Sequence, residues 1–229
     1  NRALAASTEE VRQLSYVASH DLSNPVRTIR TLLPMLQEEL QTLPDPAEQW
    51  FRYVSDAADS LHRAQQGLWA FSQITHERRF DRCDLLSIVT RARAACEWDE
   101  DTSVEVDPLP QVWGNIDQLE VVFMNLFSNA IKYRSRTRPL SISVTARSAD
   151  DKIVVAVSDN GDGFPASAAE KVFELFTRLD PDRSDGDGLG LAVCRRILIH
   201  HGGWIHAAPT ERGATFEFAL RAPEAGHAA

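Results

Sequence analysis

The sequence predicts an α+β protein with two parts, a helical hairpin followed by an α/β sandwich. Over the first 76 or so residues, apolar side chains recur at steps of three and four, which is typical of long amphipathic helices. From about Phe80, short apolar runs alternate with helical stretches and glycine-rich turns, which favours packed layers of strands and helices. We therefore expect one domain over residues 1–78, a second over 79–222, and a short tail over 223–229.

The first part reads as two helices that need a partner. The seam of the first, from about residue 7 to 40, is Ala18, Leu22, Pro25, Ile29, Leu32 and Leu36. Prolines at 44 and 46 break it. The apolar stripe of the second, roughly 47–76, is Phe51, Val54, Ala58, Leu61, Leu68 and Phe71. A single hairpin buries such stripes poorly, so we expect a homodimer with a four-helix bundle.

The second part carries three expected helices and at least three expected strands. The helices are Asp84–Cys96, Ile116–Tyr133 and Leu189–His200, and the strands are Ser141–Thr145, Lys152–Val157 and Ala214–Leu220. The polar residues of interest fall on the second helix, after the second strand, and before the third helix. The expected elements thus bring several candidate ligand groups into one domain.

Composition excludes several classes of protein. The 229 residues are 43% hydrophobic and 25% charged with a net charge of −9, which argues against a general nucleic-acid binder. Three widely spaced cysteines suggest neither a disulfide framework nor a zinc site. There is no signal-peptide pattern and no apolar run of about 18 residues, so we expect no direct membrane contact. The chain starts at Asn1 in mid-pattern, and we expect it to be a fragment that lacks an upstream domain.

His20 is the candidate nucleophile of the first helix. It lies off the apolar seam, Asp21 adjoins it, and Asn24 follows one turn later on the same face. A neutral imidazole has one nitrogen free to attack, and an adjacent carboxylate can take the proton of the other. A solvated histidine without a role is the alternative, which the surrounding Ser19–Pro25 stretch disfavours.

A second group of polar residues lies on the helix around Asn125 and Asn129. The two amides are four residues apart, and Lys132 and Tyr133 follow them. Amide oxygens suit Mg²⁺, a lysine can reach phosphate, and an aromatic ring can pack on a base or ribose. Taken alone, an asparagine pair on a helix is more often a surface feature or a cap.

Two glycine-rich turns complete the candidate site. In Asp159–Gly163, the glycines Gly161 and Gly163 let the backbone approach a ligand, and Asp159 offers an acceptor for an exocyclic amine. A simple loop is the alternative there. In the second turn, glycines before a helix can present backbone N–H groups to phosphate. Its residues are Gly186, Gly188, Leu189 and Gly190. The Asp- and Arg-rich stretch 177–187 fits a mobile lid.

Taken in order, these segments closely resemble the H, N, G1, F, G2 and G3 boxes of sensor histidine kinases, over residues 8–221. Phe173–Phe176 matches the F box and Gly213–Phe216 the G3 box. The residues Tyr16–Leu22 resemble kinases that follow phytochrome or PAS sensors. The resemblance implies a dimeric histidine-phosphotransfer hairpin and an ATP-binding sandwich of the gyrase/Hsp90/histidine-kinase type.

The resemblance also implies roles for single residues. His20 would accept the phosphoryl group and Asp21 would be its general base, while Asn24 fits a pattern associated with dephosphorylation of a regulator. The nucleotide-binding residues would be Asn125, Asn129 (also the Mg²⁺ ligand), Lys132, Tyr133, Asp159, Gly161, Gly163, Arg183, Gly186, Gly188, Leu189 and Gly190. Asn125 stands where the related ATPases carry a water-activating glutamate, which favours transfer over hydrolysis.

The implied protein is a cytoplasmic, bifunctional enzyme. It would autophosphorylate from ATP and Mg²⁺, pass phosphate to the aspartate of a response-regulator receiver domain, and also remove it. Asp187, near Asp182 and Asp185, would repel a triphosphate unless Mg²⁺ or Arg183 compensates, so net output could lean toward phosphatase. The alternatives are a phosphatase-dominant transmitter, a non-catalytic phosphotransfer scaffold, and a stand-alone ATPase.

Overall fold

A computed structural model of the chain describes residues 27–36, 38–40, 46–55, 57–58, 61, 80–179 and 188–223. The chain divides into two compact units near residues 73–74, and each is described by itself. The expected domain boundaries at 78–79 and 222–223 stay predictions.

In the hairpin unit, every described residue is helical. These residues are 27–36 and 38–40 in the first expected helix, and 46–55, 57–58 and 61 in the second. The Thr31 hydroxyl donates to the Arg27 carbonyl over 2.9 Å, the spacing of one helical turn. The seam residues Ile29, Leu32 and Leu36 are 41–51% exposed in the single chain. The dimeric bundle itself stays a prediction.

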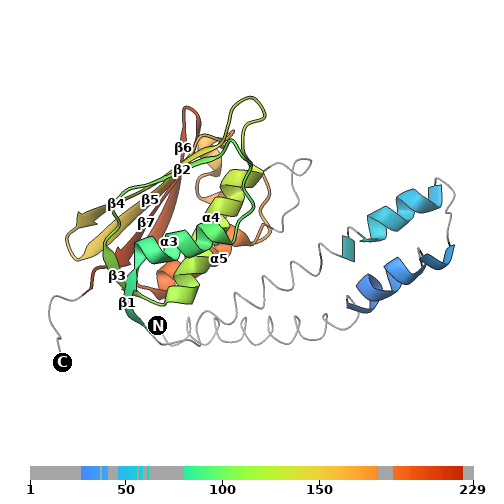
Figure 1. Ribbon diagram of the computed structural model, residues 1–229, viewed down its shortest axis with the longest axis horizontal. Helices are drawn as coiled ribbons and strands as arrows, with labels where there is room; N and C mark the ends of the chain where they lie inside the picture. Colours follow the sequence, from blue (N-terminus) through green and yellow to red (C-terminus); the bar gives the residue numbers. More distant parts are fainter. Residues whose placement is uncertain are drawn as a thin grey trace. The chain divides into compact units, whose positions relative to one another are not determined.

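The second unit is built on a mixed seven-stranded sheet (Figure 1). The strands are β1 (Asp81–Asp84), β2 (Ser103–Val106), β3 (Gln111–Gly114), β4 (Ser141–Ala149), β5 (Lys152–Asp159), β6 (Trp204–Thr210) and β7 (Gly213–Arg221). Their order is β1-β3-β7-β5-β4-β2, with β6 also paired to β7. Only β2 and β4 pair in parallel; the other ladders among the described strands are antiparallel. The ladder from β4 through β5 to β7 forms the centre of the sheet.

Three helices cover one face of this sheet: α3 (Leu85–Ala94), α4 (Ile116–Lys132) and α5 (Gly190–His200) (Figure 1). Two short 3-10 turns, η1 (Ala166–Ala168) and η2 (Lys171–Phe173), precede α5. Alternate residues of the strands point at the helices, so Phe123 of α4 meets Phe218 of β7 edge to face at 5.7 Å. Both rings are fully buried. The expected α/β sandwich is confirmed.

Helix and strand boundaries differ from the expected ones by a few residues. The expected helices Asp84–Cys96, Ile116–Tyr133 and Leu189–His200 are shorter by one to three residues. The strands β1, β2, β3 and β6 were not expected. Three of them have only four residues, too few for their alternation to stand out, and β6 contains a proline near its end.

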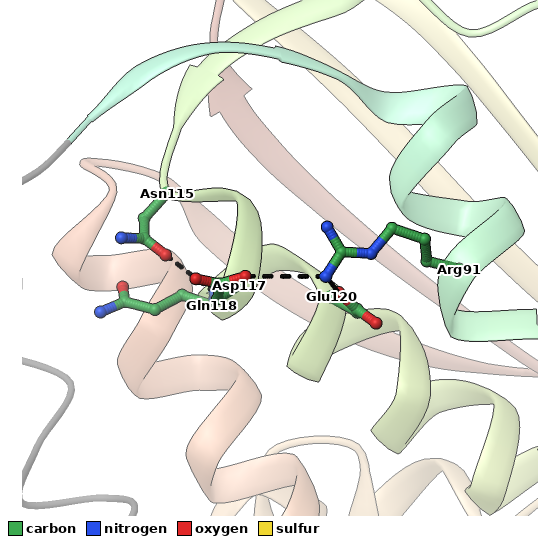
Figure 2. Close-up of polar contacts among 5 residues, drawn as sticks. All are labelled: Arg91, Asn115, Asp117, Gln118 and Glu120. Carbon is green, nitrogen blue, oxygen red and sulfur yellow. Dashed lines mark hydrogen bonds and ion pairs between the residues drawn. The ribbon is translucent and has the colours of Figure 1, made fainter. Parts of the chain in front are cut away.

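The start of α4 is fixed by polar contacts (Figure 2). The Asn115 side chain accepts a hydrogen bond from the Gln118 N–H over 3.0 Å and so caps the helix. Arg91 of α3 pairs with Glu120 at 2.5 Å and with Asp117 at 3.7 Å. These contacts hold the helix that carries the two candidate asparagines.

Candidate functional site

The exposed side of α4 presents a line of candidate ligand groups. Asn125, Asn129 and Tyr133 follow at intervals of four residues and are each partly exposed. Their spacing places them on one face over about 12 Å of helix. The Asn125 amide donates to the Val121 carbonyl over 2.9 Å, which leaves its oxygen available as an acceptor. The face of α4 that carries Asn125, Asn129 and Tyr133 therefore spans the candidate site from one end to the other.

The first end of the site is the start of α5. Gly190, the first residue of this helix, lies so close to Asn125 that a Cβ on it would come within 2.6 Å of the Asn125 Oδ1. Within the described residues, no side chain caps α5, so its first N–H groups stay available to an anion. Leu189, the residue just before α5, is buried. The start of α5 and the amide of Asn125 thus form one polar corner.

Position 188 requires glycine, because a side chain there would be strained and would clash. Its φ is +64°, and a Cβ would lie 2.6 Å from the Phe176 carbonyl carbon. The Phe176 N–H donates to the Gly188 carbonyl over 2.9 Å. The predicted F-box and G2 segments are therefore in direct contact.

The second end of the site is the turn after β5. Asp159, which was expected just after this strand, is its last residue, and its Oδ1 accepts a hydrogen bond from the Gly161 N–H over 2.8 Å. The next N–H, of Asp162, donates to the carbonyl of Tyr133 at the end of α4 over 2.9 Å. A Cβ on Gly161 would come within 2.5 Å of that same carbonyl. The turn can dock on α4 only because residue 161 is glycine.

Burial raises the pKa of the Asp159 carboxyl, and the N–H groups of Gly161 and Ala214 oppose that rise by favouring the charged form. A partly buried carboxylate with one oxygen already engaged offers its remaining capacity to a donor from outside the chain. Gly163 has a φ of +67° and packs against the Gly213 backbone at the start of β7. This wall of the site is therefore backbone rather than side chain.

Lys132 and Tyr133 lie together at the end of α4. The Lys132 ammonium stands 5.0 Å from the centre of the Tyr133 ring, within cation–π distance. Both residues lie next to the turn after β5, because the Tyr133 carbonyl accepts the hydrogen bond from the Asp162 N–H of that turn. Their predicted contact with a nucleotide stays a prediction.

Several predicted residues lie outside the described part of the chain: His20, Asp21, Asn24, Arg183 and Gly186, together with stretch 180–187 of the predicted lid. Within the described residues, no group of three or more His, Cys, Asp or Glu side chains could hold a metal ion. An amide oxygen such as that of Asn129 suits Mg²⁺ when phosphate oxygens and water supply the other ligands. The donor set is thus compatible with a metal that arrives with a nucleotide.

Two residues that shape the site were not expected from the sequence. Arg138 and the side chain of Asn160 both bind backbone groups around the Asp159 turn. Asn160 lies inside the Asp159–Gly163 motif, so its position in the sequence could have indicated its role in the turn. Arg138 is 22 residues from its partner, and no local pattern points to it.

The second unit is an α/β sandwich with candidate ligand groups along α4, and comparisons with known proteins find relatives of this domain. Residues 114–224 match the family of histidine kinase-, DNA gyrase B-, and HSP90-like ATPases. The chain is 29% identical over 225 residues to cyanobacterial phytochrome A of Nostoc and 28% identical over 227 residues to the phytochrome-like protein Cph1 of Synechocystis. These alignments cover 95% and 96% of this chain but only 29% and 30% of the relatives.

Solved structures show the same fold. Full-length ShkA, determined in complex with AMPPNP, matches 93% of this chain and 47% of its own with a TM-score of 0.69 at 20% identity. The mycobacterial sensor histidine kinase MprB matches 64% of this chain and all of its own with a TM-score of 0.53 at 25% identity. The resemblance to the transmitter core of sensor histidine kinases is thereby confirmed. No described helix combines the length and apolar character of a bilayer span.

Proposed function

We propose that this chain binds Mg·ATP and transfers the γ-phosphoryl group to His20, as the transmitter core of a sensor histidine kinase. The observation that carries the proposal is the face of α4, which joins the open start of α5 near Asn125 to the Asp159 turn at Tyr133. A nucleotide along this face would place its phosphates at the α5 N-terminus and its base at Asp159. The ATPase family match and the likeness to the sensor histidine kinase MprB support the same assignment.

Asn125, Asn129 and Asp159 would divide the binding work. The Asp159 carboxylate accepts from the exocyclic amine of adenine, and the N–H groups at the start of α5 bind phosphate oxygens. Asn129 offers its amide oxygen to Mg²⁺, with Asn125 beside it. When bound, Mg²⁺ neutralises phosphate charge, so that positioning supplies most of the catalysis.

The transfer would form a bond between an imidazole nitrogen of His20 and the γ-phosphorus. The bond from this phosphorus to the β–γ bridging oxygen breaks, and ADP leaves. Asp21 takes the proton of the other imidazole nitrogen. Because an asparagine amide cannot deprotonate water, Asn125 gives no means of activating hydrolysis, and histidine is the favoured acceptor.

The partners we propose are a second copy of the chain, a response-regulator receiver domain that takes the phosphoryl group on an aspartate, and an upstream sensor domain. We place the protein in the cytoplasm. The same domain in the relatives is one part of a longer chain.

The direct test is incubation of the chain with Mg²⁺ and γ-labelled ATP, followed by acid treatment of the labelled protein. We expect acid-labile label that His20→Ala abolishes and that His62→Ala, at another histidine of the hairpin, leaves unchanged. Label that persists in the His20→Ala chain contradicts the assigned acceptor. Steady ATP turnover without histidine phosphate would support a stand-alone ATPase instead.

We also propose phosphatase activity toward the phosphorylated regulator, because Asn24 follows His20 by four residues, which is about one turn of the helix expected there. Its amide could hold the water that attacks the aspartyl phosphate. Asn24→Ala should slow dephosphorylation of the regulator while leaving histidine labelling in place. An unchanged dephosphorylation rate would exclude this role.

A further inference from the structure

The turn after β5 is fixed from outside by the Arg138 guanidinium. Arg138 follows α4 and lies before β4, and it is partly buried. Its Nε donates to the Asn160 carbonyl over 2.7 Å, and its Nη2 donates to the Gly161 carbonyl over 2.6 Å. One edge of a planar guanidinium thus binds two successive carbonyl groups, a geometry for which its paired N–H groups are suited.

Each of these two peptide groups is held at its other end as well. The peptide between Asn160 and Gly161 gives its carbonyl to Arg138, and its N–H donates to the Asp159 carboxylate over 2.8 Å. The next peptide gives its carbonyl to Arg138, and its N–H, on Asp162, donates to the Tyr133 carbonyl. A single peptide group therefore connects the guanidinium with the carboxylate.

Asn160 ties the same turn to the start of β4. Its N–H donates to the Ser141 carbonyl, its side-chain oxygen accepts from the Ser141 N–H over 2.9 Å, and its side-chain amide donates to the Pro139 carbonyl over 3.0 Å. These bonds fix where the turn lies along the sheet. They do not fix the rotation of the peptide after Asn160; among the described residues, it is the Arg138 contact that restrains this peptide from the carbonyl side.

We propose that Arg138 is a positioning residue for recognition of the nucleotide base. It fixes the peptide that orients Asp159, and a charged donor on the carbonyl strengthens the hydrogen bond that the opposite N–H gives to the carboxylate. The carboxylate of Asp159, which the Gly161 N–H holds over 2.8 Å, is thereby kept in the position from which we propose it accepts from an exocyclic amine. The inference rests on the proposed binding of ATP, and it adds a residue that never touches the ligand.

The test compares ATP with purine riboside 5′-triphosphate, which lacks the 6-amino group that Asp159 would bind. The affinities of both nucleotides are measured in the full chain, with Mg²⁺, for wild type and Arg138→Met. We expect wild type to prefer ATP by roughly tenfold, the difference that one charge-assisted hydrogen bond makes. Arg138→Met should remove most of this preference, chiefly by weakening ATP, whereas a general loss of structure would weaken both nucleotides.

Two further variants control the result. Arg136→Met removes the same charge two residues away; Arg136 is exposed, and no hydrogen bond or ion pair of its side chain is found within the described residues, so the preference should stay. Arg138→Lys keeps the charge but cannot bind two carbonyls along one planar edge, so it should restore only part of the preference. It also replaces Arg138→Met if that variant does not fold.

A measurement without nucleotide reports directly on the structure of the turn. Amide exchange of Gly161 and Asp162 should accelerate in Arg138→Met, and in an Asp159→Asn background the Arg138 substitution should leave the nucleotide preference unchanged. An Arg138→Met or Arg138→Lys chain that keeps the full preference for ATP overturns the positioning role alone. A wild-type chain that binds no ATP, or shows no preference for the 6-amino group, overturns the proposed function at Asp159 and this inference with it.

Discussion

At the scale of single residues, His201 shows how a buried polar group supports the site from a distance. The residue is 6% exposed, and its Nε2 accepts a hydrogen bond from the Asn115 N–H over 3.0 Å. Because Nε2 is an acceptor, Nδ1 carries the proton and donates to the Ile197 carbonyl at 2.8 Å. The neutral imidazole thus links the end of α5 to the residue that caps α4.

This arrangement predicts a loss of stability in acid. Burial lowers the pKa of His201 to about 4 from its usual 6.5. Between these pH values the unfolded chain binds a proton that the folded chain excludes, so the free energy of unfolding falls as pH falls. The His201 contribution to this fall between pH 7.5 and 4.5 should be about 2–3 kcal/mol, measured by urea denaturation.

The comparison uses two glutamine variants. His201→Gln should show a smaller difference in stability between pH 7.5 and 4.5 than wild type, whatever its stability at neutral pH. His206→Gln, at an exposed histidine of β6, should keep the wild-type difference. An equal pH dependence in wild type and His201→Gln would contradict the buried neutral imidazole.

Residues of the site differ in how far the sequence predicts them. Asp159 was expected after a strand because charge and glycines are adjacent in the chain. His201 bonds to a residue 86 positions away, and Arg138 to one 22 positions away. A local pattern reports neighbours along the chain, so contacts made by the packing of distant elements leave no mark in it.

At the scale of elements, the two ends of α5 use glycine for different reasons. At its start, Gly190 leaves room for the Asn125 amide. Past its end, Gly202 has a φ of +70° with nothing within 4 Å of a Cβ, while the Gly203 N–H donates to the Leu198 carbonyl over 2.8 Å, as in a glycine C-cap. The first glycine serves the site, and the second serves the fold.

Alanine should therefore reduce nucleotide affinity at position 190 and the stability of the fold at position 202. In Gly190→Ala the Asn125 side chain must swing away, so affinity for Mg·ATP should fall by roughly tenfold while the melting temperature changes by no more than about 3 °C. Gly202→Ala should lower stability by about 1 kcal/mol through its left-handed backbone and leave the affinity unchanged. Calorimetry of binding and of unfolding on both variants checks this; unchanged affinity in Gly190→Ala would contradict the role of Gly190.

The helices and central strands followed from the sequence, and the short strands did not. Helix α4 buries seven of its residues at a helical period, which makes the pattern strong. Because side chains alternate with a period of two residues, the four residues of β1 or β3 show at most two periods of the pattern. Those strands exist because neighbouring strands complete their hydrogen bonds, which is a property of the sheet.

At the scale of the whole molecule, the sandwich unit has a buried core, whereas several apolar seam residues in the described part of the hairpin are exposed. The described residues 80–223 bury large side chains such as Phe123, Phe127 and Phe218 between helices and sheet. In the hairpin, Ile29, Leu32, Leu36 and Leu40 all remain at least 41% exposed in the single chain. Apolar residues at seam spacing that a single chain leaves in water favour association with a second copy.

A charge on this seam should therefore separate the dimer without unfolding the sandwich. Leu32 is 49% exposed in the single chain, so Leu32→Glu costs little in an isolated protomer but would bury a carboxylate inside a four-helix bundle. Leu86→Glu is the matched control, because Leu86 of α3 is 46% exposed and lies outside the hairpin. Light scattering after size exclusion should give twice the chain mass for wild type and Leu86→Glu, and a single chain mass for Leu32→Glu, with ATP affinity equal in all three. A Leu32→Glu chain that still runs as a dimer would place the contact between protomers elsewhere.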